Sequence, residues 1–518
     1  MMLRTLPRVA PILALSLITL HAAAQGGDAD RSTDKPAAPD KSAATPADAD
    51  DAEHADASAR DAKPKPHELK AEPVVELPPP SSVAAPRTRI ESGCPRTNFE
   101  DKTGWRLSLC GYAALNAMHD STQSFGAGVN NAVVARRGTY AGDHDQMQFT
   151  AKDSRLTVDA SAPPTHGIEA AGLIQLDFTG VMPSETTEND TYVFGTPRLR
   201  LAMMKLHTPV VDVIAGQYHD LFGWGGTGYF PSTLGFLGLP GEIYHRQPQF
   251  RLSKTLHTDA VDVDVAGAAV RPVQKASGIP DFEGGLRLAI NHFTGANQQA
   301  YGQPSIGPAS IGVSGIARRF EVAEFVRKPA DPVQKVGWGF ALDAVLPIIP
   351  RSSNDDRSNG LTVTGEFTTG TGISDLYTGL TGGALFPTIS NDTASPVPPY
   401  YTPNIDSGIV TFDANGALHT INWQAVVVGL QYYLPIGGGR VWVSGSYTQT
   451  KSTNITVLTP IPNRGSVYFK SEYEDGNLFV AITDAVQLSA SFQTVRQLFG
   501  DGVSARNNRI EFGSHFFF

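Results

Sequence analysis

Residues 507–518, at the end of the chain, alternate between apolar and polar side chains with a period of two. Because successive side chains of a strand point to opposite faces, this segment predicts a strand with one apolar and one polar face. The apolar face carries Ile510, Phe512, Phe516 and Phe518. Such an edge is an aggregation hazard in water, whereas in lipid its phenylalanines would anchor a strand at the membrane interface. The alternative is the buried last strand of a soluble β-sandwich.

The same alternation recurs from residue 104 onward, in segments of about 9–15 residues that have the length of membrane-spanning strands. We place these strands near 104–119, 146–160, 166–180, 196–208, 210–220, 242–257, the stretch after Thr258-Asp259, 283–295, 308–320, 335–348, 360–371, 420–435, 440–452, 475–483, 485–499 and 506–518. The sequence therefore predicts an all-β fold, a transmembrane antiparallel β-barrel of about 16 strands over residues 100–518.

The connections between these strands alternate between long and short. The long ones are near 120–145, 181–195, 221–241, 372–419 and 453–474, and the short ones are near 161–165, 209, 258, 436–439 and 484. Outer-membrane barrels show this asymmetry, with short turns in the periplasm and long loops outside. Long loops such as 372–404 can also fold inward and narrow a lumen. Gly223–Gly228 lacks the lysine of a phosphate-binding loop and is interpreted as a flexible loop.

The composition argues against a helical membrane protein. Hydrophobic residues make up 41% of the 518 residues, and the mean hydropathy is −0.16. No stretch of the mature chain approaches the roughly 18 apolar residues of a spanning helix. The net charge of −10, without a basic stripe, argues against nucleic acid as a partner.

The N-terminus has the features of a secretory signal peptide over residues 1–24. Arg4 and Arg8 supply the positive region, Val9–Leu20 is a short apolar run, and Ala22–Ala24 offers small residues for cleavage. The alternative is a retained anchor helix.

Residues 25–99 are rich in Ala, Pro and Asp and nearly lack aromatic side chains. A segment of this kind cannot bury enough apolar surface to offset its ordering entropy, so we predict a disordered periplasmic segment. Contact with an envelope component is a further hypothesis for it.

Cys94 and Cys110 are the two cysteines of the chain. In an oxidising compartment, a disulfide between them would tie the segment before the barrel to the first strand and stabilise the fold by about 3 kcal/mol. The alternative is two free buried thiols.

Several basic side chains fall on the polar faces of the predicted strands and are expected to point into the lumen. They are Arg155, Arg198, Arg200, His245, Arg251, Arg287 and Arg318. The assignment rests on apolar neighbours that we expect to look outward, which are Leu156, Val158, Leu199, Leu201, Met203, Phe250 and Leu252. A charge facing lipid at the midplane would cost roughly 2–4 kcal/mol.

Arginines on neighbouring strands would form a positive wall. Guanidinium groups bind carboxylate or phosphate through paired hydrogen bonds, and exposure to water keeps that binding weak enough for the solute to leave. This favours facilitated diffusion of small anions. The alternative is that these arginines pair with carboxylates inside the lumen, namely Glu169, Asp177, Asp343 and Glu366.

No motif in the sequence favours an enzyme, because no nucleophile elbow and no zinc-ligand spacing occurs. We therefore expect no enzymatic activity and no cofactor. Asp143-His144-Asp145 suits either a divalent-ion site on an outer loop or a solvated turn.

Some stretches resemble the DcaP-like outer-membrane porins. They are Ser154-Arg155-Leu156, Pro197-Arg198-Leu199-Arg200-Leu201 followed by Ile214-Ala215-Gly216-Gln217, Gly241-Glu242-Ile243-Tyr244-His245-Arg246-Gln247, and Thr369-Gly370-Thr371-Gly372-Ile373-Ser374-Asp375-Leu376-Tyr377. The resemblance spans residues 100–518 and implies a sixteen-stranded trimeric channel for small, often carboxylated solutes. Those porins tend to carry a heptad-patterned helix before the barrel. This chain is Pro-rich there, which argues against trimerisation through an N-terminal coiled coil but not through the barrel walls.

The sequence thus favours a porin in the outer membrane of a Gram-negative-type cell, with outer-membrane lipid and small hydrophilic solutes as its partners. One alternative is a non-conducting barrel that serves adhesion or envelope tethering. A second is a soluble all-β binding protein.

Overall fold

The computed structural model describes residues 97–126, 133–180, 195–225, 229–234, 239–297, 305–323, 332–379, 405, 408–413 and 415–518. The predicted signal peptide and nearly all of the predicted periplasmic segment lie outside these residues. Within the described part, no helix is long and apolar enough to cross a membrane.

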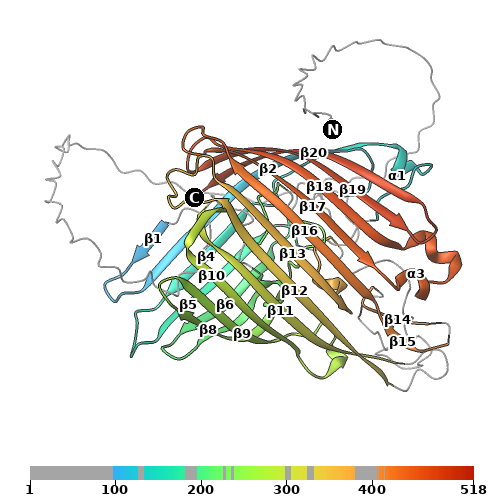
Figure 1. The fold of residues 1–518 in the computed structure, drawn as a ribbon, viewed down its shortest axis with the longest axis horizontal. Helices are drawn as coiled ribbons and strands as arrows, with labels where there is room; N and C mark the ends of the chain where they lie inside the picture. Colours follow the sequence, from blue (N-terminus) through green and yellow to red (C-terminus); the bar gives the residue numbers. More distant parts are fainter. Residues whose placement is uncertain are drawn as a thin grey trace, which may run out of the picture. The chain divides into compact units, whose positions relative to one another are not determined.

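The described chain is built almost entirely from one antiparallel sheet that closes on itself (Figure 1). Its strands are β1 (Thr97–Glu100), β2 (Arg106–Asp120), β3 (Gln146–Thr150), β4 (Arg155–Ser161), β5 (Glu169–Asp177), β6 (Arg198–His207), β7 (Asp212–His219), β8 (Arg246–His257), β9 (Val261–Val270), β10 (Asp281–Asn297), β11 (Ser305–Ala323), β12 (Pro332–Ile349), β13 (Leu361–Thr371), β16 (Asn422–Tyr433), β17 (Val441–Ser452), β18 (Tyr468–Ala481), β19 (Val486–Phe499) and β20 (Ser504–Phe517). A separate hairpin joins β14 (Val410–Phe412) to β15 (Leu418–Thr420), and the short helices include α1 (Tyr140–Asp143) and α3 (Ile455–Leu458).

The sheet holds 18 strands, of which sixteen positions form the wall. β3 and β4 both pair with β2 and act as one interrupted strand, and β1 pairs with the part of β2 that β20 does not reach. The wall closes where β2 pairs with β20, from Tyr112 opposite Phe517 to Asp120 opposite Arg509. The prediction of an antiparallel barrel of about 16 strands is therefore confirmed.

The outside of the wall is apolar and the inside is polar. In β20, Ile510 and Phe512 are 48% and 59% exposed, whereas Arg509 and Glu511 are buried. Exposed apolar side chains continue round the barrel, among them Leu115, Phe149, Leu156, Ile174, Leu199, Phe250, Leu252, Leu286, Leu288, Phe340, Leu342, Phe367, Val428, Leu430, Leu478, Leu488 and Phe492. Such a surface suits lipid, because water would be in contact with an apolar belt on every side.

A β-bulge in β6 changes which of its side chains face outward. The register between β5 and β6 shifts by one residue at Arg200, so the alternation reverses beyond it. Leu199 is 48% exposed, as expected, but Leu201 and Met203 are only 5% and 7% exposed and pack against Leu173. The prediction that Leu201 and Met203 look outward is therefore wrong.

The strand predicted at 475–483 begins earlier, at Tyr468. Its first half carries charged side chains on the outer face, Lys470, Glu472 and Glu474, where the sequence analysis looked for apolar ones. Because these residues lack apolar alternation, they were predicted to belong to the preceding loop. That loop, predicted over 453–474, ends before Tyr468.

Cys110 lies in β2 and is disulfide-bonded. Cys94 lies outside the described residues, so the pairing of the two remains a prediction.

Candidate functional site

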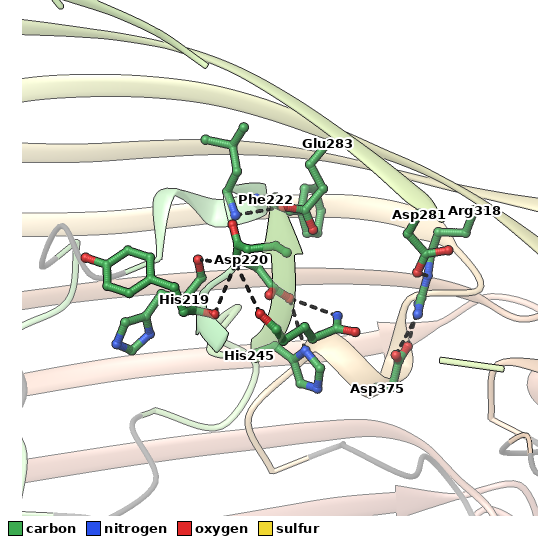
Figure 2. A network of polar contacts seen from close by, with 12 residues as sticks. His219, Asp220, Phe222, His245, Asp281, Glu283, Arg318 and Asp375 are labelled. Carbon is green, nitrogen blue, oxygen red and sulfur yellow. Dashed lines mark hydrogen bonds and ion pairs between the residues drawn. The ribbon is translucent and has the colours of Figure 1, made fainter. Parts of the chain in front are cut away.

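The connection between β7 and β8, residues 220–245, folds into the barrel. It begins with the 3-10 turn η1 (Phe222–Trp224), which packs against β10, β11 and β12. The Phe222 N–H donates to Glu283 Oε2 on β10 at 3.1 Å, as Figure 2 shows. Because β7 and β10 are separated round the wall by β8 and β9, this bond draws the start of the connection across the interior.

Gly223 occupies a position that no other residue fits without strain. Its φ is +71°, and a Cβ there would lie 2.7 Å from the Ile243 Cβ. The turn is buried, so the expectation of a flexible loop over Gly223–Gly228 is wrong for Gly223–Gly225. Residues 226–228 lie outside the described residues.

The middle of the same connection reaches the far wall. The Ser232 N–H donates to Gln431 Oε1 on β16 at 3.0 Å, and Trp442 Nε1 on β17 donates to Ser232 Oγ at 3.2 Å. Thr233 Oγ1 donates to Asp475 Oδ2 on β18 at 2.9 Å. The connection therefore spans the interior from β7 to β18.

The end of the connection lies beside the segment that follows β13, residues 372–379. The Tyr244 N–H donates to the Leu376 carbonyl at 3.2 Å, and the Ile243 N–H donates to Glu366 Oε1 on β13 at 2.8 Å. Two connections from different parts of the chain thus meet inside the barrel, which is the arrangement of a constriction.

Arg318 fixes the second connection. Its guanidinium is fully buried and donates through Nη1 and Nη2 to the two carboxylate oxygens of Asp375, at 2.6 and 2.7 Å (Figure 2). Nε donates to Asp281 Oδ2 on β10 at 2.8 Å. Asp375 belongs to the 3-10 turn η3 (Ser374–Leu376). Burial raises its pKa, but the adjacent Arg318 charge outweighs burial and holds the pKa below its ordinary value.

His245 contacts the first residue of the inward connection. Its Nδ1 lies 3.0 Å from Asp220 Oδ2 (Figure 2). The structure places His245 at the end of the inward connection, just before β8 begins at Arg246. The predicted strand at 242–257 therefore starts too early, because its first residues belong to the constriction.

Arg198 and Arg200 face the interior from β6 and share one carboxylate. Asp177 on β5 accepts from Arg198 Nη2 at 2.6 Å and from Arg200 Nη1 at 2.7 Å. Arg200 Nη2 also donates to the Tyr244 hydroxyl at 3.1 Å, so a hydrogen bond joins the inward connection to β6. Two cations on one anion leave the wall locally positive.

Three further arginines of the same wall lie over tyrosine rings. The pairs are Arg155 with Tyr112 at 5.4 Å, Arg246 with Tyr244 at 5.2 Å, and Arg251 with Tyr218 at 5.7 Å. The charges of Arg155, Arg198 and Arg200 all act on Arg246. The basic wall, defined here as Arg155, Arg198, Arg200, Arg246 and Arg251, thus brings together β4, β6 and β8. Arg246 is not among the residues predicted to line the lumen, although it lies within the Gly241–Gln247 stretch.

Arg287 lies apart from the basic wall. It comes from β10, and its Nη1 donates to Asp264 Oδ2 on β9 at 2.7 Å. Arg318 is likewise elsewhere, and its partners are Asp281 and Asp375. Of the carboxylates considered as partners in the sequence analysis, Asp177 is the one that binds the predicted arginines in the ion pairs described here.

Buried carboxyl groups line the inward connection on the side away from the basic wall. Asp343 on β12 is directly opposite Glu366 on β13, and Glu242 of the connection acts electrostatically with both. Glu242 Oε2 accepts the Leu239 N–H at 2.9 Å. Burial raises the pKa of Glu242 well above its ordinary value. The constriction therefore has a basic side and an acidic side.

The Asp143-His144-Asp145 run behaves as a hydrogen-bonded turn. Asp143 Oδ2 accepts the Gly138 N–H at 2.9 Å, and His144 Nδ1 lies 2.7 Å from the Tyr140 carbonyl oxygen. Asp145 Oδ2 lies 3.0 Å from His119 Nε2. The three side chains therefore contact three different partners and do not converge on one point. No group of three or more His, Cys, Asp or Glu in the described part of the chain could hold a metal ion.

Comparison with solved structures identifies the fold. The chain is similar to the outer membrane channel DcaP of Acinetobacter baumannii, with 18% identity and a TM-score of 0.56 over 81% of this chain and 99% of that one. It is also similar to the anion-selective porin from Comamonas acidovorans, with 9% identity and a TM-score of 0.46 over 80% and 100% of the chains. A third similar structure is OmpT, an outer membrane protein of Vibrio cholerae, in its trimer form, with 8% identity and a TM-score of 0.42 over 80% and 99% of the chains.

No family model and no curated protein matches the chain. The likeness to DcaP shows that the chain has the fold of an outer-membrane channel.

Proposed function

We propose that this barrel is an outer-membrane porin through which small hydrophilic solutes diffuse. The observation on which the proposal rests is the inward connection of residues 220–245, which crosses the interior and is hydrogen-bonded to β10, β13, β16 and β18. A barrel that served only as an anchor would need no such ordered crossing. A channel needs one to set the width and charge of its narrowest point.

The basic wall supports a preference for anions, and for carboxylates in particular. Guanidinium groups offer paired donors that match a carboxylate, while stacking on Tyr112, Tyr218 and Tyr244 holds them in place. Among the described residues, Asp177 is the carboxylate that forms ion pairs with Arg198 and Arg200. A solute carboxylate would replace the Arg198 part of that pairing and then leave, because 33% of the Arg198 side chain is exposed to water.

Reversal potentials across a KCl gradient test this proposal. The protein in planar bilayers is expected to conduct and to prefer chloride, and Arg198→Ala with Arg200→Ala should shift the reversal potential towards cation preference. Arg319→Ala is the matched control, because Arg319 pairs with Glu321 on β11 away from the basic wall. An ion preference that does not change in the double variant would exclude these two residues from selectivity.

The same experiment separates the alternative function. A barrel for adhesion or tethering would show no conductance steps, in the wild type and in both variants. The proposal also places the N-terminal region, with its signal peptide over 1–24 and the segment 25–99, on the periplasmic side. Deleting residues 25–90 should leave conductance unchanged in a porin and abolish the function of a tether.

A further inference from the structure

The outer face of β17 to β20 carries a group of charged side chains beyond one edge of the apolar belt. This group, called here the rim patch, consists of Lys451, Lys470, Glu472, Glu474, Arg496 and Arg506. Lys451, Arg496 and Arg506 alternate with buried residues of their strands, and Lys470, Glu472 and Glu474 lie on the same face of β18 as the exposed Leu478, so all six lie on the outside of the barrel. Lys451 and Lys470 flank the long connection between β17 and β18, and Arg496 and Arg506 flank the short turn between β19 and β20 at the same end of the barrel.

The cations of the rim patch face one another across two strand pairs. Lys451 of β17 is directly opposite Lys470 of β18, and Arg496 of β19 is directly opposite Arg506 of β20. Like charges directly opposite each other destabilise an antiparallel pair. An anion bound between the two cations of each pair would relieve this repulsion.

The protein itself supplies only part of that negative charge. Glu472 Oε1 lies 2.6 Å from Lys470 Nζ, and Glu472 Oε2 lies 3.8 Å from Arg496 Nη1. In the described part of the chain, neither Lys451 nor Arg506 takes part in an ion pair, and the Arg496 side chain is 57% exposed. Four cations thus stand against two carboxylates, and the excess is positive.

The height of the rim patch places it among lipid headgroups. Arg506 lies twelve positions before Phe518 along β20. With a rise of about 3.3 Å per residue and a tilt of about 45°, this corresponds to roughly 28 Å along the membrane normal. The apolar belt of such barrels is about 25 Å tall, so Arg506 stands just beyond it when Phe518 anchors the other interface.

We propose that the rim patch binds the phosphate groups of a diphosphorylated outer-leaflet glycolipid of the lipid A type. Each like-charged pair would take one phosphate, since guanidinium and ammonium groups both bind phosphate oxygens strongly. The two pairs are two strand spacings apart and are offset by two residues along the strands, because Arg496 is opposite Glu472 and not Lys470. Their separation is therefore about 12 Å, which requires a headgroup with two separated phosphates. The acyl chains would then cover Leu478, Leu488 and Phe492 below the patch. This inference rests on the outer-membrane placement proposed above, but it does not require a conducting lumen.

Binding of purified diphosphoryl lipid A to the full-length protein in detergent tests the inference. Arg496→Gln with Arg506→Gln, and separately Lys451→Gln with Lys470→Gln, should each weaken binding roughly thirtyfold, because each charge near a phosphate surface contributes about a factor of five to six. The control Arg319→Gln removes one outward arginine from β11 and should leave binding unchanged. Monophosphoryl lipid A should bind wild type more weakly than the diphosphoryl form.

Several outcomes would overturn the inference. Equal affinity of the wild type and both double variants would show that the patch does not recognise the headgroup. Displacement of the lipid by inorganic phosphate at the same concentration would assign the patch to free anions. Loss of an oligomer in native mass spectrometry, with lipid binding unchanged, would assign it to a second copy of the chain. Conductance is measured on the same samples, so that failure of the porin proposal is seen separately.

Discussion

Arg318 and Asp375 form a two-point ion pair, in which Nη1 lies 2.6 Å from Oδ1 and Nη2 lies 2.7 Å from Oδ2. The pair links β11 to the connection that follows β13, so it holds one side of the constriction to the wall. Both side chains are almost completely excluded from solvent. Removing Asp375 leaves the buried Arg318 charge with Asp281 as its remaining ion-pair partner among the described residues, and the loss of one partner of a buried pair is strongly destabilising.

Asp375→Ala should therefore destabilise the barrel by about 3–5 kcal/mol and release residues 372–379 from the wall. Unfolding of the detergent-solubilised protein measures the stability, and open-channel current noise measures the release. Asp501→Ala is the control, since the Asp501–Arg136 pair is partly exposed and should contribute less than about 1 kcal/mol. An equal loss of stability in the two variants would contradict this role for Arg318.

The same pair predicts a pH dependence. The folded-state pKa of Asp375 is lowered by Arg318, so the ionised form stabilises the fold at every pH above the ordinary value of 3.8. This stabilisation is lost only as the pH falls through the lower folded-state pKa. Unfolding followed between pH 7 and pH 5 should show no loss due to Asp375, and Asp375→Ala should show the same slope there. A steep loss in the wild type alone over that range would be the contrary result.

Glu242 predicts the opposite trend. Burial raises its pKa above the ordinary 4.5, so between these two values the folded protein holds a proton that the unfolded chain has released. Stability should fall as the pH rises through this window. Glu242→Gln keeps an oxygen to accept the Leu239 N–H and removes the titration, so its stability should fall less with pH. Identical pH slopes for the two proteins would rule out ionisation of Glu242 as the cause.

Gly223→Ala should widen the channel. The new Cβ would lie 2.7 Å from the Ile243 Cβ at a φ of +71°, so the turn must move away from the other end of the inward connection, to which Ile243 belongs. We expect a cost of about 1–3 kcal/mol and a larger single-channel conductance. Gly278→Ala is a close control, because Gly278 has a φ of +70° and nothing within 4 Å of its Cβ position. If both variants conduct alike, steric contact with Ile243 does not set the width.

Cys110 predicts a covalent link to the segment before the barrel. We expect Cys94–Cys110 as the pair, and reduction should lower stability by about 3 kcal/mol. Peptide mapping without reductant should recover the two cysteines in one cross-linked fragment. Cys110→Ser should be as stable as the reduced wild type, and two alkylatable thiols in the unreduced protein would disprove the pairing.

The wall of the barrel could be predicted from the sequence because its signal is local. Alternation in β20 and in β16 needs no knowledge of distant residues, since lipid on one side and water on the other impose the same period everywhere. The bulge at Arg200 escaped prediction because it reverses the alternation within a single strand. The first half of β18 escaped because its outer face is charged.

The constriction could not be predicted in the same way. Residues 220–245 have no periodic pattern, and their fixed points are side chains far along the chain, such as Glu283, Gln431 and Asp475. The glycine-rich stretch at Gly223 suggested a flexible loop. In the structure, the absence of a side chain at Gly223 allows the turn to pack closely against Ile243. The partners of the arginines depend on the register between strands and could not be derived from spacing.

The seam between β2 and β20 has a consequence for how this molecule is made. The wall is completed by joining the earliest strand of the cylinder to the latest one, so the ring stays open until the final residues have been synthesised. Any nascent or truncated chain that lacks β20 leaves β2 and β19 with edges of unpaired amides and carbonyls. The barrel can therefore close only after β20 has been made, and cellular factors that protect the chain must shield both edges until then.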